Sequence, residues 1–222
     1  MADGSLDLDP SQTDVDDADS VTGVAVAKVI DNIDIQGTAR VQISLPWLPG
    51  FEPWARVAAP MAGMGRGTYF IPQVGDEVLV AFNQGDIREP YILGSLWSSV
   101  DKPPALLPAD PINKRIIQTP LGHKIQFDDL TQEISITSST MQTITMGLKG
   151  ITISAGTAPP PAKSTITMDV AGNITIDAKL SLSLKAPSIS ISGKKVDISG
   201  DAATTVKGGA KCAIQGGIVN IN

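Results

Sequence analysis

The sequence predicts an all-β protein with two unlike halves, a small barrel in front and a thin β-rod behind. Runs in which apolar and small polar residues alternate with period two follow one another through the rear half. Gly and Pro punctuate these runs and leave no room for a helix there. All three Trp residues lie in the first hundred positions. Only the front half can therefore pack around large side chains.

Composition sets the outer bounds. The 222 residues and 42% hydrophobic content allow one or two domains with a sizeable core. Residues 1–20 carry seven Asp and no Lys or Arg, which predicts an acidic disordered leader. The single cysteine, Cys212, excludes an intrachain disulfide. We expect neither a signal peptide nor a membrane span, so assembly would take place in the cytoplasm and delivery outward would follow another route.

The front half contains five short strand-like runs. They cover residues 24–30, 39–45, 55–58, 77–82 and 91–96. Turn-forming residues separate them at 32–37, 46–53, 63–67, 75–76 and 83–90. Five short strands in this spacing predict a closed barrel of the OB-fold type over residues 21–98.

The rear half is predicted to be a β-rod joined to the barrel by a Pro-rich connector. The connector covers residues 99–115 and the rod residues 116–222. Strands are expected at 116–119, 124–129, 133–137 and 142–146, followed by a loop at 157–162. Strands then resume from residue 164 to the end, with clear runs at 174–178, 180–184, 189–192 and 196–199. Such a ribbon has one apolar face and little of its own to cover it. Because each fully buried aliphatic side chain contributes about 1.5–3 kcal/mol, winding with copies of itself is the simplest way to gain burial.

Four segments carry a resemblance to a known family. They are residues 73–82 (QVGDEVLVAF), 85–97 (GDIREPYILGSLW), 102–104 (KPP) and 113–129 (NKRIIQTPLGHKIQFDD). In this order they resemble the Gp5/VgrG-like family of central spike proteins, which includes phage baseplate assembly protein V. The resemblance rests on sequence motifs over residues 21–130 and on the general strand-rich character of the remaining residues.

The resemblance implies a homotrimeric spike of a contractile injection machine: a phage tail, a tailocin, an extracellular injection system or a type VI secretion system of a bacterium. The OB-fold barrels would sit on a baseplate hub protein, and an intertwined, trimeric β-helix needle would pierce the target membrane. The short segment before the barrel is similar to the gpV-like version, in which the hub is a separate protein. The implied role is structural and not enzymatic, with no cofactor.

The resemblance also suggests which residues matter. We expect the trimer core to contain Ile174, Ile176, Leu182, Ile189, Ile191, Val196 and Ile198. The uncharged end would form a flat tip with unpaired strand edges, capped by a PAAR-repeat protein. The tip residues are Ile214, Ile218, Val219, Ile221 and Asn222. Arg66, in a Gly-rich barrel loop, is a candidate contact with the hub.

Other functions are less well supported by the residues. The only histidine, His123, lacks nearby ligand partners, which favours a structural hydrogen bond. A single histidine also disfavours the metal-bearing tip with His-x-His motifs that some phage spikes of the family have. Asp128 and Asp129 are adjacent on a strand and would point to opposite faces, which disfavours a metal site. Nucleic-acid binding by the barrel is opposed by nine Lys/Arg against twelve Asp/Glu in residues 21–146. The alternative that stays open is a monomeric β-solenoid enzyme acting on polysaccharide.

Overall fold

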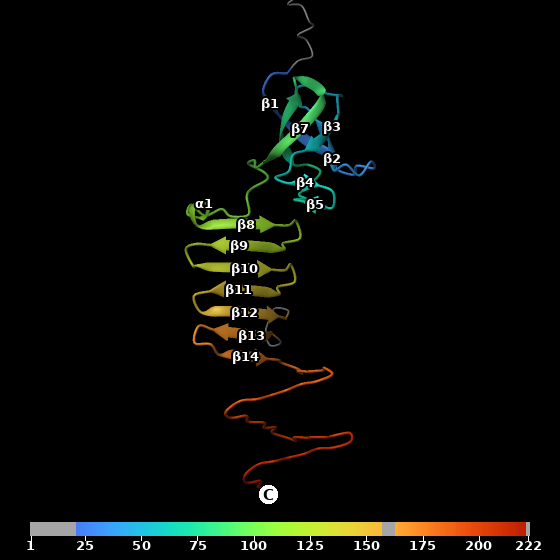
Figure 1. Ribbon diagram of the computed structural model, residues 1–222. Coiled ribbons are helices and arrows are strands. Elements are labelled where there is room, and N and C mark those ends of the chain that lie inside the picture. Colours follow the sequence, from blue (N-terminus) through green and yellow to red (C-terminus); the bar gives the residue numbers. More distant parts are fainter. Residues whose placement is uncertain (1–20, 157–162, 221–222) are drawn as a thin grey trace, which may run out of the picture.

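The computed structural model describes residues 21–156 and 163–220. It places a closed β-barrel at one end of a stack of antiparallel strands (Figure 1). The predicted leader at residues 1–20 and the predicted loop at 157–162 lie outside the described residues. The observed architecture is mostly β, with an N-terminal five-stranded barrel and a C-terminal antiparallel region, as the alternating pattern predicts.

The barrel closes in the order β1-β2-β3-β7-β6. Its strands are β1 (Val24–Asp31), β2 (Arg40–Ser44), β3 (Trp54–Val57), β6 (Glu77–Asn83) and β7 (Asp86–Leu96). All pairings are antiparallel except that of β3 with β7, which closes the barrel in parallel. The five predicted strands are confirmed with shifts of a few residues at their ends.

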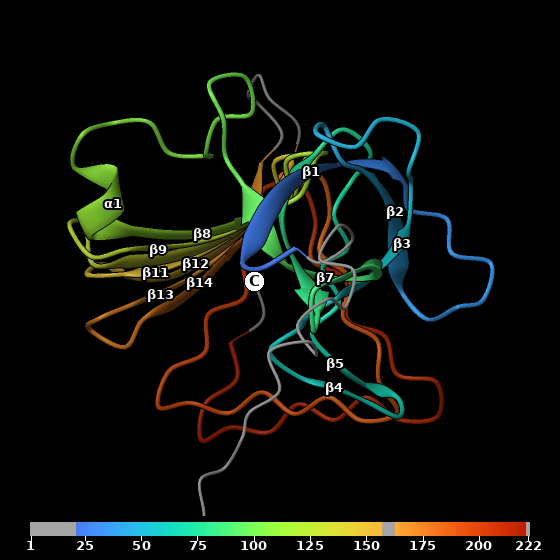
Figure 2. The ribbon, with the colours of Figure 1, turned by 90° about the horizontal axis from the view of Figure 1, so that it is seen from above.

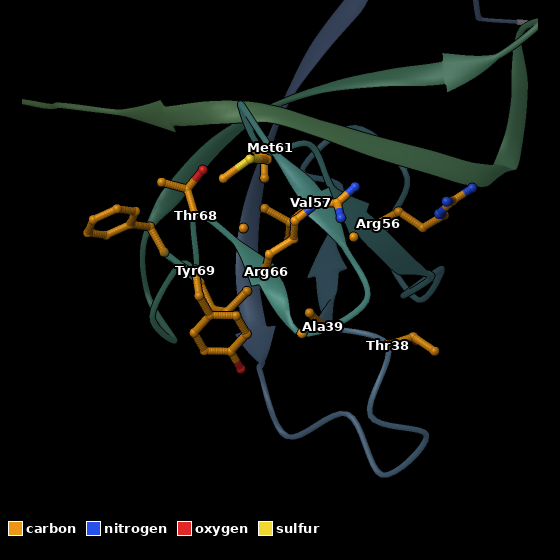
Figure 3. Close-up of a pocket in the computed structure, with 15 residues that line it drawn as sticks. Thr38, Ala39, Arg56, Val57, Met61, Arg66, Thr68 and Tyr69 are labelled. Carbon is orange, nitrogen blue, oxygen red and sulfur yellow. The ribbon is translucent and has the colours of Figure 1, made fainter.

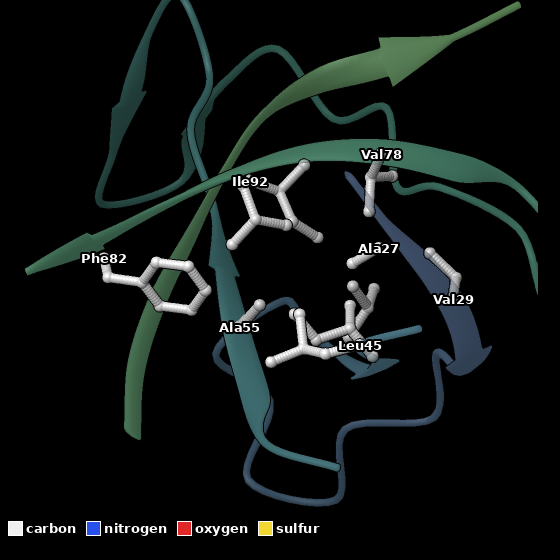
Figure 4. Close-up of a cluster of buried hydrophobic side chains, with 10 residues drawn as sticks. Ala27, Val29, Leu45, Ala55, Val78, Phe82 and Ile92 are labelled. Atoms are coloured by element: carbon white, nitrogen blue, oxygen red, sulfur yellow. The ribbon is translucent and has the colours of Figure 1, made fainter. Parts of the chain in front are cut away.

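The buried hydrophobic core lies wholly in the barrel. Alternate residues of each strand point inward and meet in one cluster (Figure 4). Its members are Ala27, Val29, Val41, Ile43, Leu45, Ala55, Val78, Val80, Phe82 and Ile92. Among the described residues outside the barrel, no hydrophobic side chain is buried in a single chain. The barrel can therefore be stabilised by its own core, whereas the stack of strands cannot.

Two predicted barrel turns are wrong in part. Residues 63–67 form a small hairpin, in which β4 (Ala62–Gly63) pairs with β5 (Arg66–Gly67). Gly67 adopts φ +149°, and a Cβ there would lie 2.6 Å from the carbonyl oxygen of Met61, so the hairpin needs glycine at this position. Residues 83–90 were expected as one turn, but β7 already begins at Asp86. The turn itself is confined to the Gln84-Gly85 pair.

The connector ends in one helical turn, α1 (Asp110–Asn113), which leads directly into a seven-stranded sheet. Its strands are β8 (Lys114–Gln118), β9 (Lys124–Asp128), β10 (Glu133–Thr137), β11 (Thr143–Gly147), β12 (Gly150–Ala155), β13 (Ser164–Asp169) and β14 (Ile174–Asp177). Each strand pairs with the next along the chain. The strand β12 was not among the predicted runs.

Gly150, the first residue of β12, permits both the tight turn from β11 and the close approach of β13. It pairs with Gly147 across a two-residue turn and adopts φ +116°. A Cβ at Gly150 would lie 2.0 Å from the carbonyl oxygen of Met168 on β13. Only glycine at this position lets β13 approach β12 so closely.

The structure assigns no strand to residues 178–220 of a single chain, although strands were predicted at 180–184, 189–192 and 196–199. The chain runs on beyond β14 as wide, extended turns (Figures 1 and 2). A strand is defined by ladder hydrogen bonds to a neighbour, and within one chain this segment has none. These three strand predictions are therefore wrong for a single chain, because alternation of apolar and polar residues does not by itself provide a pairing partner.

Candidate trimer interface and docking surfaces

One face of the seven-stranded sheet carries an unbroken row of isoleucines. The strand register places these side chains opposite one another, one from every strand: Ile117, Ile125, Ile136, Ile144, Ile153, Ile166 and Ile176. Such directly opposed pairs are the basic stabilising contact of a sheet. In a single chain each of the seven side chains keeps between 37% and 52% of its surface exposed.

A second row lies beside the first on the same face. It consists of Arg115, Phe127, Ile134, Met146, Ile151, Met168 and Ile174. Thirteen of the fourteen side chains in the two rows are apolar, and the exception, Arg115, lies on the first strand. We call these fourteen residues the apolar face.

The opposite face of the sheet is polar. Its central row beyond β8 is Gln126, Ser135, Thr145, Thr152, Thr167 and Thr175. A neighbouring row brings the hydroxyls of Thr143 and Ser154 to 2.5 Å from each other. Ser154 is buried in this pair and most of the central row is partly buried, so in a single chain the two faces differ in polarity rather than in exposure.

The predicted trimer-core residues fall into two groups. Ile174 and Ile176 lie on β14 and belong to the apolar face. The other five lie beyond β14 and are about half to three-quarters exposed in a single chain: Leu182, Ile189, Ile191, Val196 and Ile198. The structure brings the first group together with the other isoleucines and places the second group in a segment without a strand.

The predicted tip is described only in part. Ile214 and Ile218 are exposed and Val219 is half-exposed, in a segment without a strand. Ile221 and Asn222 lie outside the described residues. Cys212, close to this end, is an exposed free thiol in a single chain.

Arg66 lies on the β4–β5 hairpin beside a pocket of about 560 Å³ (Figure 3). Arg56 lines the same pocket, and no acidic residue does. At the rim, Met61, Tyr69 and Phe70 are more than half exposed. The pocket is thus positive and apolar, which is a chemistry suited to an acidic partner segment.

Three aspartates organise the loops around these surfaces. Asp34 accepts hydrogen bonds from the Arg40 guanidinium and from the Thr38 hydroxyl, and these contacts hold the pKa of Asp34 well below its ordinary value. Arg88 likewise lowers the pKa of Asp86 to about 2. Asp110, buried at the start of α1, lies 2.8 Å from the Lys114 ammonium, and that hydrogen bond lowers its pKa. All three carboxylates therefore stay ionised at neutral pH.

His123 and Asp128, the candidate metal ligands of the sequence, both form hydrogen bonds with the backbone. His123 accepts a hydrogen bond at Nδ1 from the Ser139 N–H, at 3.2 Å, in keeping with the predicted structural role. Asp128 accepts hydrogen bonds from the backbone of Leu130 and Thr131 and closes the β9–β10 turn. Over the part of the chain that the structure describes, no three His, Cys, Asp or Glu side chains gather as a metal site would need.

Comparison with known proteins identifies both parts of the chain. Residues 25–97 match the type VI secretion system/phage-baseplate injector OB domain. Residues 114–180 match the phage baseplate V C-terminal trimerisation domain. A barrel of the first kind followed by a sheet of the second defines a baseplate spike component. The chain thus carries a phage baseplate V/VgrG-like OB domain followed by a phage baseplate V trimerisation domain, with VgrG spikes as distant relatives, and the trimerisation domain implies a homotrimer.

The similar curated proteins are much longer than this chain. The type VI secretion system spike protein VgrG2a of Pseudomonas aeruginosa is 28% identical over 129 residues, which is 52% of this chain and 15% of that protein. VgrG3 of Vibrio cholerae is 30% identical over 123 residues, 51% of this chain and 12% of that protein. VgrG4b of P. aeruginosa is 44% identical over 57 residues, 26% of this chain and 7% of that protein.

No helix in the described part of the chain is long and apolar enough to cross a membrane.

Proposed function

We propose that three copies of this chain form the central spike of a contractile injection machine. In this proposal the barrels sit on a baseplate hub protein and the rods wind together into a needle. Contraction drives the needle through the target membrane. The role is mechanical rather than catalytic, and needs neither a cofactor nor nucleic acid.

The apolar face is the observation that carries the proposal. Two rows of mainly Ile, Met and Phe run the whole length of the sheet and stay partly exposed in a single chain. Three such faces turned toward a common axis would form a dry core, because each face is complementary to two others of the same kind. The match of residues 114–180 to a trimerisation domain supports this arrangement.

The segment beyond β14 would supply the intertwined part of the needle. Its backbone groups have no ladder partner within the chain, while its apolar residues still alternate with Ser, Thr and Asp. Pairing with the other two protomers would satisfy those groups and cover Leu182, Ile189 and Ile191 together. A needle wound this way resists pulling and bending, because many backbone bonds must break at once.

The two ends of the spike would meet different partners. At the barrel end, the positive pocket with Arg66 is the surface we assign to the hub. At the other end, the uncharged residues Ile214, Ile218 and Val219 would present exposed backbone to a PAAR-repeat tip protein. The spike would be assembled in the bacterial cytoplasm as part of the injection machine and delivered outward when the machine contracts.

The native mass of the full chain tests the proposal. Light scattering should give three times 23.1 kDa, and the trimer should survive SDS without boiling, because an intertwined rod unfolds very slowly. A monomer would refute the spike and make the polysaccharide-active solenoid the leading hypothesis. A trimer that dissociates in cold SDS would refute the intertwined needle alone.

A further inference from the structure

Four of the barrel's five basic residues gather around two pockets that share a wall. Arg56 and Arg66 line the pocket of about 560 Å³ in Figure 3. Arg56 also lines a smaller pocket of about 240 Å³ together with Arg40 and Arg88. Strands β2, β3, β5 and β7 each contribute one of these arginines. We call these four residues, with Trp54 and Tyr91, the arginine surface.

Aromatic rings hold two of the guanidinium groups in place. Arg40 lies over the ring of Trp54 at 5.7 Å, and Arg56 lies over the ring of Tyr91 at 5.6 Å. The strand register explains this order, because Arg40 is opposite Arg56 and Arg56 is opposite Tyr91. A guanidinium stacked on a ring keeps its N–H groups directed along its plane, where they can still donate to a carboxylate.

The arginine surface holds four arginines against three neighbouring carboxylates, Asp34, Asp86 and Glu89, the last of which lines the smaller pocket. Arg40 pairs with Asp34, and Arg88 pairs with Asp86. Within residues 21–156 and 163–220, neither Arg56 nor Arg66 has a carboxylate partner. This excess stands out in a chain whose net charge is −6.

The described chain begins near one end of this surface, directly after the most acidic segment of the sequence. The N–H of Val21 donates to the carbonyl of Gly85, at 3.0 Å, in the turn between β6 and β7. Gly85 precedes Arg88 by three positions, so Val21, the first described residue, lies near the Arg88 end of the arginine surface. Because an extended chain covers about 3.3 Å per residue, even ten residues reach roughly 30 Å.

We propose that the acidic leader, residues 3–19, binds the arginine surface of the barrel. Ionised Asp side chains only accept hydrogen bonds, so the seven aspartates of the leader would accept them from the guanidinium groups of Arg56 and Arg66. Arg40 and Arg88 would add to the positive potential of the surface. Each exposed pair is weak, but several in series on a segment tethered at Val21 hold it in place. The contact should weaken as ionic strength rises. In the free protein the leader would occupy the pocket that we assign to the hub in the assembled spike, so the two would compete for Arg56 and Arg66.

Arginine labelling of the intact protein tests the proposal. The probe is phenylglyoxal, which modifies accessible guanidinium groups, and the readout is the labelling rate of Arg56 and Arg66 by mass spectrometry. The variant replaces five leader aspartates by asparagine, D7N, D9N, D14N, D16N and D17N. These changes lie outside the barrel and leave its core untouched.

Labelling of Arg56 and Arg66 should be roughly three- to ten-fold faster in this variant, as expected when about one or two exposed ion pairs are lost. High salt should have the same effect on the natural sequence. The matched control, S11A/T13A, changes the leader without its charge and should leave the rates unchanged. Acetylation of Lys28, on β1 and outside the arginine surface, should not respond to any of these changes.

Equal labelling rates in the asparagine variant and the natural sequence would overturn the proposal. That result would mean that a neighbouring barrel, or nothing, covers the surface. A rise that includes Lys28 to the same extent would also overturn it, because the leader would then be acting on the whole barrel.

Discussion

Placing a charge on the isoleucine row should prevent trimer formation. Ile144 lies on β11, in the middle of the sheet, between Ile136 and Ile153. Its neighbour in the chain, Thr145, points to the polar face. The pair Ile144→Asp and Thr145→Asp therefore introduces the same charge at adjacent positions, toward the proposed axis in one case and toward the polar face in the other.

The magnitude follows from the exposure that remains in a single chain. Ile144 keeps 37% of its surface, so covering it in the trimer would gain about a third of the ~1.5–3 kcal/mol for a whole side chain. Over three protomers this is about 2–3 kcal/mol for a single residue of the row. Asp at this position loses that gain and also forces three carboxylates into an apolar interior, each at a cost of several kcal/mol. The Thr145→Asp carboxylates would lie on the polar face, opposite the hydroxyl side chains of Ser135 and Thr152.

Light scattering and unboiled SDS gels of both variants measure the outcome. We expect a monomer or aggregate for Ile144→Asp and a trimer of unchanged SDS resistance for Thr145→Asp. A stable trimer of Ile144→Asp would show that the apolar face does not turn toward the axis. Loss of the trimer in both variants to the same extent would show that the sheet, rather than one face of it, is sensitive to charge.

Three further predictions address the rest of the chain. Replacing both Ile189 and Ile191 by Asp should abolish the trimer if the segment beyond β14 winds with its partners; analytical ultracentrifugation showing an intact trimer would contradict the inward assignment. Deleting residues 216–222 should leave the trimer intact but end its capture of a PAAR-repeat protein in a pull-down, and undiminished capture would place the cap elsewhere. Because the folded state lowers the pKa of Asp34, its contribution to stability is present above the ordinary value of 3.8 and is lost as the pH falls below it. Thermal unfolding of the natural sequence should therefore shift more steeply below about pH 4 than that of Asp34→Asn, and parallel pH profiles would show that the Asp34–Arg40 contact does not matter.

The barrel strands could be predicted because their signals are local. Alternation at residues 24–30 or 77–82 reports which side chains share a face, and Gly or Asn reports where the chain turns. The β4–β5 hairpin was missed because two-residue strands are too short to show a period. The strand β12 went unnamed because Gly150 starts it, and a glycine there has a meaning only in relation to Met168 on the next strand.

The docking surfaces needed the tertiary structure. The Gly-rich loop predicts Arg66 as a candidate contact. Arg56, which lines the same pocket, lies on a different strand, and nothing in the sequence indicates that the two arginines are close in space. The arginine surface exists because barrel closure brings β2 and β3 beside β7. Barrel closure is a long-range event, and the spacing of the four arginines along the chain does not reveal it.

The amino-acid sequence by itself determined that the rear half has one apolar and one polar face, since a period of two is written into each short run of residues. It also determined that a single chain lacks the material to cover that apolar face. Only the tertiary structure decided which isoleucines line up in one row, because register depends on ladder hydrogen bonds between strands and on the turns that join them. It also decided that strand pairing within the described part of the chain ends at β14, because a ladder needs a neighbouring strand in reach and the alternating pattern alone does not supply one.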